Sequence, residues 1–333
     1  MISKSGIGNT PMIKIFYEYE GIEDYIFAKL EYYNRTGSIK DRIAYRILNK
    51  AIEKGELKDG MPIVEATSGN TGISLAALGS YYKHPVVIFM PDWASKERVD
   101  LMKGFGANVI LISKEDGGFI RCVNEAKKYA EENNGFLVNQ FANRENLMAH
   151  YEETASEILE QMPIKPLGFV SGVGTGGTLM GIGKRLKDEY EDSKIIAIEP
   201  DKMPIISTGK IISSHKIEGI GDDFVPDLVD KSVIDDIILV NDDDAINMAR
   251  KLAKELGLGV GISSGANLIG AVLSSRKLKN TSSNINERAI VTVFADDNKK
   301  YLSTDLSKSL DDLNIDTTDF ISTKVKLLRH ENV

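Results

Sequence analysis

The chain has 333 residues, with 41 Lys or Arg against 49 Asp or Glu, so its formal net charge is −8. This acidic balance argues against nucleic-acid binding as a main role and against docking on an anionic membrane. The lone cysteine excludes an internal disulfide, and the four scattered histidines have no metal-ligand spacing, so no metal site is expected. The first residues lack the apolar core of a secretory signal, so we expect a cytoplasmic protein. The length predicts about two domains.

Short β-branched runs alternate with longer helix-like stretches along the chain. The expected strands lie at 62–65, 86–90, 109–112, 169–170, 195–198 and 290–294. The expected helices lie at 39–54, 71–82, 96–105, 119–133, 145–161, 177–190, 242–256 and 266–278. This alternation predicts an α/β fold in which helices flank a parallel sheet.

Lys40 lies at the start of an expected helix, in the segment NRTGSIKDR. Ser38 is expected to cap that helix, with Asp41 three residues later as its capping-box partner. The helix dipole disfavours a cation in the first turn, which lowers the pKa of the amine and makes it a better nucleophile toward a carbonyl. The alternative is a surface lysine paired with Asp41, and this segment alone leaves both open.

Two polar, glycine-containing stretches, 66–72 and 261–266, each precede an expected helix. In the first, hydroxyl and amide side chains together with free backbone N–H groups suit a carboxylate. Helix capping by Ser68 or Asn70 is the alternative there. In the second stretch, capping alone explains the residues equally well.

The sharpest glycine-rich stretch, SGVGTGGT at 171–178, lies between an expected strand and an expected helix. Glycines let the backbone approach an anion closely, and the N-terminus of a helix presents free N–H groups, so the stretch predicts a phosphate site. Gly172, Gly174 and Gly177 also have the spacing of a dinucleotide-binding turn, with Glu199 after the next strand. Because that acid comes later than the usual ~20 residues, the dinucleotide interpretation is the weaker one.

Six motifs occur in the order found in one enzyme family. They are GIGNTP at 6–11, TGSIKDR at 36–42, TSGNTG at 67–72, GTGGT at 174–178, GIG at 219–221 and GISSG at 261–265. Each is weak alone, but the six together are specific, and the chain resembles cysteine synthase (O-acetylserine sulfhydrylase) and its relative cystathionine β-synthase over roughly residues 5–305. The resemblance implies a fold type II enzyme: α/β, with two domains that each hold a mostly parallel twisted sheet flanked by helices, and pyridoxal 5′-phosphate in the cleft between them.

The resemblance also implies how the chain is divided. Residues 40–145 would form a smaller mobile domain that carries the substrate-carboxylate loop. Residues 1–39 and 146–310 would form a larger cofactor-binding domain, and 311–333 a peripheral C-terminal extension. The family further implies a homodimer.

The resemblance assigns three kinds of contact to the cofactor. Lys40 would hold it as an internal Schiff base and later remove the Cα proton of the substrate, while Asn70 would bond its 3′ oxygen. Ser263 would face the pyridine nitrogen, with the adjacent Ser264 as the alternative. The phosphate would be cradled by Gly174, Thr175, Gly176, Gly177 and Thr178.

The implied substrate is a β-substituted alanine. Its β-leaving group would depart to give an α-aminoacrylate, and sulfide, a thiol or water would add to Cβ. The default reaction is O-acetylserine plus sulfide to cysteine plus acetate. The residues implied to hold the substrate carboxylate are Thr67, Ser68, Gly69, Thr71 and Gln140, and those implied to border the amino-acid pocket are Gly219, Ile220 and Gly221.

Two aspartates after Gly221 depart from the cysteine synthase pattern, which continues there with alanine and glycine. Cystathionine β-synthases carry tyrosine and aspartate at these positions. A carboxylate of Asp222 or Asp223 is therefore a candidate general base for the incoming nucleophile. With water, the enzyme would convert cysteine to serine and hydrogen sulfide, and with a thiol it would form a thioether. The alternative is that both aspartates only cap or salt-bridge their loop.

Two other classes of function stay open from the sequence. A catalytically silent protein that keeps the fold predicts a cofactor absorbance band that no substrate changes. A nicotinamide-dependent dehydrogenase predicts NAD binding and no yellow colour.

Overall fold

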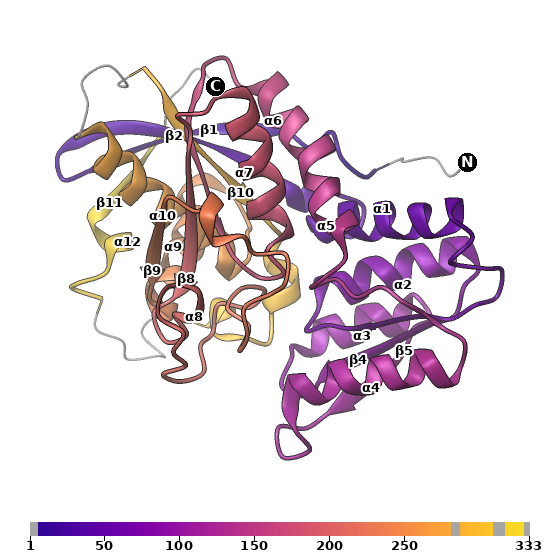
Figure 1. The fold of residues 1–333 in the computed structure, drawn as a ribbon. Helices are drawn as coiled ribbons and strands as arrows, with labels where there is room; N and C mark the ends of the chain where they lie inside the picture. The colour runs from indigo at the N-terminus through magenta and orange to yellow at the C-terminus, as the bar shows by residue number, and fades with distance from the viewer. Residues whose placement is uncertain (1–5, 281–286, 309–316, 330–333) are drawn as a thin grey trace.

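The computed structural model describes residues 6–280, 287–308 and 317–329 (Figure 1). Two sheets organise this part of the chain. The larger has the strand order β11-β1-β2-β10-β7-β8-β9, and the smaller has the order β5-β4-β3-β6. The smaller sheet and its helices lie to one side of the larger sheet in Figure 1. The predicted α/β fold with two mostly parallel sheets is confirmed.

The larger sheet is parallel from β2 to β9 and ends in two antiparallel strands, β1 and β11. Its strands are β1 (Met12–Tyr19), β2 (Ile22–Leu30), β7 (Pro166–Gly172), β8 (Lys194–Pro200), β9 (Asp236–Val240), β10 (Ala289–Phe294) and β11 (Val325–Leu328). Alternate residues of β7 face opposite cores: Val170 packs with α9 (Asp242–Leu256) and α10 (Ile262–Lys279), whereas Phe169 packs with α7 (Gly177–Glu189). Burial on both faces is typical of a central parallel strand.

The smaller sheet is entirely parallel. Its strands are β3 (Ile63–Ala66), β4 (Val86–Pro91), β5 (Asn108–Ile112) and β6 (Phe136–Leu137), and its helices are α1 (Lys40–Glu53), α2 (Asn70–Tyr82), α3 (Lys96–Gly104) and α4 (Gly118–Glu132). Ile63 packs in the core that contains α1 and α2, while Val64 packs against α4 and the buried Cys122. The sheet is thus covered on both faces.

Five strands were not expected from the sequence. In β1, Ile15, Tyr17 and Tyr19 are buried at every second position, which is the signal of a half-buried strand. The turn to β2 places both Glu20 and Gly21 at positive φ. The strands that sequence reasoning missed are β1, β2, β6, β9 and β11.

The strand β11 lies in the segment expected to be a peripheral extension. It pairs antiparallel with β1, with Tyr19 opposite Val325, whose side chain is fully buried. The short helix α12 (Ile321–Lys324) before it is held by the carboxylate of Asp244, which accepts the backbone N–H groups of Ile321 and Ser322. This part of the extension is therefore built into the larger sheet, whereas 311–316 and 330–333 lie outside the described residues. The domain boundaries at 39/40, 145/146 and 310/311 stay a prediction.

The helix expected at 145–161 is interrupted. The structure has α5 (Arg144–Ala149), a π-helical turn at His150–Thr154 and α6 (Ala155–Gln161). The π turn packs on α7 at Gly181, where an added Cβ would lie 2.7 Å from His150 Cβ and 2.9 Å from the Tyr151 backbone nitrogen. The remaining short elements are α8 (Ile205–Thr208) and the 3₁₀ turns Glu31–Tyr33, Lys231–Val233, Asn298–Tyr301 and Asp305–Ser307.

Within residues 6–280, 287–308 and 317–329, no helix has the length and apolar character needed to cross a membrane. The same residues contain no group of three or more side chains arranged to ligate a metal ion.

Candidate active site

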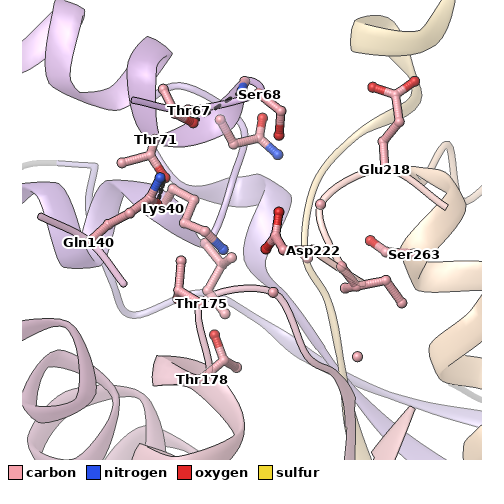
Figure 2. Close-up of a pocket in the computed structure, with 18 of the residues that line it drawn as sticks. Lys40, Thr67, Ser68, Thr71, Gln140, Thr175, Thr178, Glu218, Asp222 and Ser263 are labelled. Atoms are coloured by element: carbon pink, nitrogen blue, oxygen red, sulfur yellow. Dashed lines mark hydrogen bonds between the residues drawn. The ribbon is translucent and has the colours of Figure 1, made fainter. Parts of the chain in front are cut away.

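A pocket that is open to solvent lies where loops of both sheets meet (Figure 2). The loops after β3 and β7 leave the carboxyl ends of parallel strands and lead into α2 and α7, which is where ligands bind in open α/β sheets. The predicted residues that line the pocket are Lys40, Thr67, Ser68, Gly69, Asn70, Thr71, Gln140, Gly174, Thr175, Gly176, Thr178, Gly219, Ile220, Asp222 and Ser263. The predicted residues outside its lining are Gly177, Gly221 and Asp223.

Lys40 is the first residue of α1, and its side chain points into the pocket toward Asp222 (Figure 2). Burial lowers the pKa of its amine, while the carboxylates of Asp296 and Asp222 oppose that shift. Desolvation is thus the main cause of the lowered pKa, rather than the helix dipole invoked from the sequence. The pocket location also excludes the surface-lysine alternative.

The expected capping box at the start of α1 is wrong. The N-cap position is Ile39, and no side chain caps it. The Asp41 carboxylate instead accepts the backbone N–H of Thr36 at 2.6 Å and the Thr36 hydroxyl at 2.6 Å. Asp41 therefore holds the preceding turn in place, and the Ser38 hydroxyl accepts only the N–H of Lys40, at 3.3 Å.

The glycine-rich turn before α7 is shaped by close contacts. Gly176 has φ +86, which an L side chain rarely adopts. Gly177 packs on Asn146, because an added Cβ would lie 1.9 Å from Asn146 Oδ1. The hydroxyls of two turn residues contact the segment 146–150. The Asn146 amide donates to the Thr175 hydroxyl at 2.9 Å, and the Thr178 hydroxyl lies 3.2 Å from His150 Nε2. The turn lies at the N-terminus of α7, whose free N–H groups suit an anion, so residues 174–178 remain a predicted anion cradle.

The dinucleotide interpretation of this turn fails at Glu199. Both carboxylate oxygens of Glu199 accept backbone N–H groups at the start of α8, from Ile206 at 2.5 Å and Ser207 at 3.0 Å. Glu199 is only 2% exposed, and both of its carboxylate oxygens bind backbone N–H groups of the protein itself. No acid is left at that position for a ribose hydroxyl.

The loop between β3 and α2 is braced by Gln140. Thr71 donates to Gln140 Oε1 at 2.6 Å, and the Gln140 amide donates to the Ala66 carbonyl at 3.1 Å. The Gln140 backbone N–H binds Glu65, whose pKa burial raises to about 7. The loop thereby presents hydroxyls and the N-terminus of α2 to the pocket, which suits a carboxylate.

Asn70 is held by Asp296, which follows β10 of the larger sheet. Its amide donates to Asp296 at 2.8 Å, and the Tyr301 hydroxyl donates to the same carboxylate at 2.8 Å. Among the described residues, Asn70 Oδ1 and Asp296 Oδ1 are buried without a partner. Of the two candidate serines, Ser263 lines the pocket, whereas the Ser264 hydroxyl accepts the backbone N–H of Ala295 at 3.2 Å.

The loop after Gly219 places one aspartate in the pocket. The N–H of Gly221 donates to the Val173 carbonyl at 2.9 Å, and His215 Nε2 lies 2.7 Å from the Gly221 carbonyl oxygen. Burial and the neighbouring Asp223 raise the pKa of Asp222 to about 6, although Lys40 opposes the shift. Asp223 itself is exposed.

Sequence reasoning missed several residues of the site. Arg98 on α3 forms an ion pair with Glu218, and both line the pocket. Asn146 and His150 support the anion cradle from behind. Nothing in the sequence near Arg98, Asn146 or His150 marks them, because each acts on a loop far away in the chain.

A sequence model of the family described as "Pyridoxal-phosphate dependent enzyme" matches residues 4–296. The chain is 39% identical over 301 residues to a cysteine synthase of Staphylococcus aureus, covering 90% of this chain and 94% of that protein. It is similar to the crystal structure of a hydrogen sulfide-producing enzyme from Fusobacterium nucleatum, with 49% identity, a TM-score of 0.92 and coverage of 99% and 96%. An aspartate-to-asparagine variant of a hydrogen sulfide-producing enzyme, solved with an α-aminoacrylate intermediate, has 49% identity, a TM-score of 0.93 and coverage of 99% and 97%.

Proposed function

The chain belongs to the family of pyridoxal-phosphate-dependent enzymes, and we propose that it replaces the β-substituent of an amino acid in cysteine and sulfide metabolism. The observation that carries this proposal is that a buried amine and two anion sites open into one pocket. Lys40 supplies the amine, the turn before α7 suits a phosphate, and the loop before α2 suits a carboxylate.

The residues present fit the cofactor. The turn 174–178 is narrow enough that side chains at its glycines would clash, as expected for a backbone that approaches a phosphate. Asn70 would bond the 3′ oxygen with its amide, and Ser263 would face the ring nitrogen. Lys40 would be the point of covalent attachment. When bound, pyridoxal phosphate withdraws electrons from Cα and so eases loss of the Cα proton and of a β-leaving group.

The residues around the cofactor site would bind the substrate, accept its Cα proton and limit water. Thr67, Ser68, Gly69, Thr71 and Gln140 would bind the α-carboxylate of the substrate and orient its Cα. The lowered pKa of the Lys40 amine keeps it neutral more readily, so that its nitrogen is able to accept the Cα proton. Gly219 and Ile220 would border the amino acid, whereas Gly221, also predicted to do so, lies outside the pocket lining. The phenylalanines Phe119 and Phe141 also line the pocket and limit water there.

The default direction is the synthesis of cysteine from O-acetylserine and sulfide. Its support is the likeness to cysteine synthases over nine-tenths of the chain. Sulfide is small and readily anionic near neutral pH, so it adds to Cβ without a base from the protein.

A second direction, release of hydrogen sulfide from cysteine with water or a thiol as acceptor, is favoured by Asp222. A carboxylate with a pKa raised to about 6 is mostly ionised at pH 7 yet still accepts a proton, as a general base must. The likeness to a hydrogen sulfide-producing enzyme supports this direction.

The test is a spectral titration of purified enzyme with cysteine, serine and O-acetylserine separately. We expect cysteine or O-acetylserine to change the cofactor absorbance, because each has a β-leaving group. Product analysis with each substrate, by sulfide release and by amino-acid chromatography, then separates the two directions. If no amino acid changes the spectrum, the proposal is refuted in favour of a catalytically silent protein.

We propose further that the enzyme acts in the cytoplasm as a homodimer. The support is the family, together with a lone, buried cysteine of the kind expected in a reducing compartment. Light scattering on the purified protein measures the mass in solution and tests the dimer.

A further inference from the structure

One buried carboxylate beside the pocket has no role in the reaction described so far. Asp296 lies just after β10 and is 1% exposed, although it does not line the pocket itself. Its Oδ1 atom has no hydrogen-bond partner in the described part of the chain. Because a buried polar atom without a partner costs free energy, the stability of the fold does not explain why a carboxylate stands here.

The position of Asp296 is fixed from several sides. Its carbonyl oxygen accepts the N–H of Gly261 at 3.0 Å, and its backbone pairs with Ser38 in an isolated antiparallel bridge. An added Cβ at Gly261 would clash with Asp296 Oδ1, so the backbone there packs directly on the carboxylate. The Tyr301 hydroxyl donates to Oδ2 at 2.8 Å. The carboxylate is therefore a fixed acceptor rather than a mobile side chain.

The other donor to Asp296 Oδ2 is the side-chain amide of Asn70, at 2.8 Å. A carboxylate only accepts hydrogen bonds, so the amide nitrogen faces it and the amide oxygen faces away. The nitrogen carries two N–H groups, and Asp296 uses one of them. Since Asn70 lines the pocket, its second N–H is left for a ligand. The carboxylate thus selects one of the two orientations of the amide.

We propose that Asp296 is a positioning residue that orients the Asn70 amide, so that the second N–H donates to the 3′ oxygen of pyridoxal phosphate. This inference rests on the contact proposed above between Asn70 and that oxygen, and it does not depend on the direction of the reaction. With the amide turned over, Asn70 Oδ1 would face the 3′ oxygen, and two acceptors would repel each other.

The charge of Asp296 also reaches the point of cofactor attachment. It opposes the lowering of the Lys40 pKa by burial, and of the charged groups that act on Lys40 it has the largest effect. The same carboxylate therefore lies near the two side chains that would hold neighbouring parts of the cofactor, the amine of Lys40 and the amide of Asn70.

The test compares two cofactors bound to the full chain, which is stripped and reloaded. Equilibrium dialysis gives the dissociation constants of pyridoxal phosphate and of 3-deoxypyridoxal phosphate, which lacks the 3′ oxygen. The second constant divided by the first is called the 3′ ratio below. Asn70→Ala removes the donor and should lower the 3′ ratio about 10- to 100-fold, since the lost contact is a hydrogen bond to a charged group.

Asp296→Asn keeps the size of the side chain but adds a donor, so that either orientation of the Asn70 amide is allowed. It should lower the 3′ ratio about 3- to 10-fold, the value of one neutral hydrogen bond. In the Asn70→Ala background, Asp296→Asn should have no further effect on the ratio, because the two residues act as one unit. Asp297→Asn is the matched control. It removes an equal charge one position along the chain, where the carboxylate accepts the N–H of Lys299, and should keep the ratio.

The outcomes separate the inference from the contact on which it rests. If Asn70→Ala lowers the 3′ ratio and Asp296→Asn does not, the inference is overturned and the contact of Asn70 stands. Equal weakening of both cofactors in Asp296→Asn also overturns it, because the carboxylate then only supports the fold. If Asn70→Ala keeps the ratio, the contact fails and the inference fails with it. Asp296→Ser, which removes the carboxylate without adding bulk, should give the same loss and serves if Asp296→Asn does not fold.

Discussion

Replacing Asp222 by asparagine tests the general-base hypothesis directly. Burial, and then repulsion from Asp223, raise the pKa of the Asp222 carboxyl to about 6. At pH 5 about a tenth of the carboxyl is therefore ionised, and at pH 7 about nine-tenths. Since only the ionised form accepts a proton, the rate with water or a thiol should rise about ninefold between these pH values. Asp222→Asn should lower that rate by ~10²–10⁴ and remove the rise.

Asp223→Asn is the matched control, because it removes an equal charge from an exposed neighbour outside the pocket lining. It takes away one cause of the raised pKa of Asp222, so the acidic limb should move to lower pH while the plateau rate stays. The assay is a pH–rate profile of hydrogen sulfide release from cysteine for both variants. A profile of Asp222→Asn that keeps the plateau and the rise, or a larger loss in Asp223→Asn, refutes the reasoning.

Asp222→Asn should stabilise the folded protein even though it lowers the reaction rate. The pKa of the Asp222 carboxyl is raised from 3.8 to about 6 by folding, so above pH 3.8 the folded state becomes less stable relative to the unfolded state. This destabilisation reaches at most about 3 kcal/mol above pH 6. Asp222→Asn should therefore raise the free energy of unfolding at pH 7 and leave it unchanged below pH 4. Denaturant titrations at both pH values measure this, and equal gains at both contradict the assigned cause.

Three further outcomes are expected. Borohydride reduction and peptide mapping should find the reduced cofactor on Lys40, and an adduct on any other residue contradicts the site. Gly177→Ala should weaken cofactor binding at least tenfold in equilibrium dialysis, because its Cβ would lie 1.9 Å from Asn146 Oδ1, and unchanged binding rejects that contact. Arg42→Ala should lower the free energy of unfolding by about 3–5 kcal/mol in urea, because it removes the guanidinium that lies 2.6 Å from the fully buried carboxylate of Glu31, and a loss below about 1 kcal/mol rejects this.

Much of the pocket could be predicted from the sequence because its residues come in short runs. The segments 67–72 and 174–178 are strand-to-helix turns, where local backbone chemistry and function coincide. Nine of the fifteen predicted site residues that line the pocket lie in these two turns. For Lys40, the sequence predicts the position in the site but not the cause of its lowered pKa. That cause is desolvation, which depends on residues that pack over Lys40 from other elements.

The rest depends on contacts between distant parts of the chain. Arg98 and Glu218 are brought together only when loops of both sheets meet, and neither lies in a recognisable motif. Asn146 reaches Thr175 from a helix whose interruption by a π turn has no sequence signal. Strand β1 is different, because its side chains alternate between buried and half-buried and this alternation is readable in the sequence, whereas the second half of β2 is buried throughout.

The pairing of β11 with β1 joins the two extremes of the chain. Lys326 and Glu18 form an ion pair across this junction, 2.6 Å apart and 308 positions distant along the sequence. During synthesis on the ribosome, the outer edge of β1 therefore stays unpaired until residues 325–328 have emerged. An uncovered edge is a template for pairing with other chains, so nascent or prematurely terminated molecules should self-associate through β1 far more readily than finished ones.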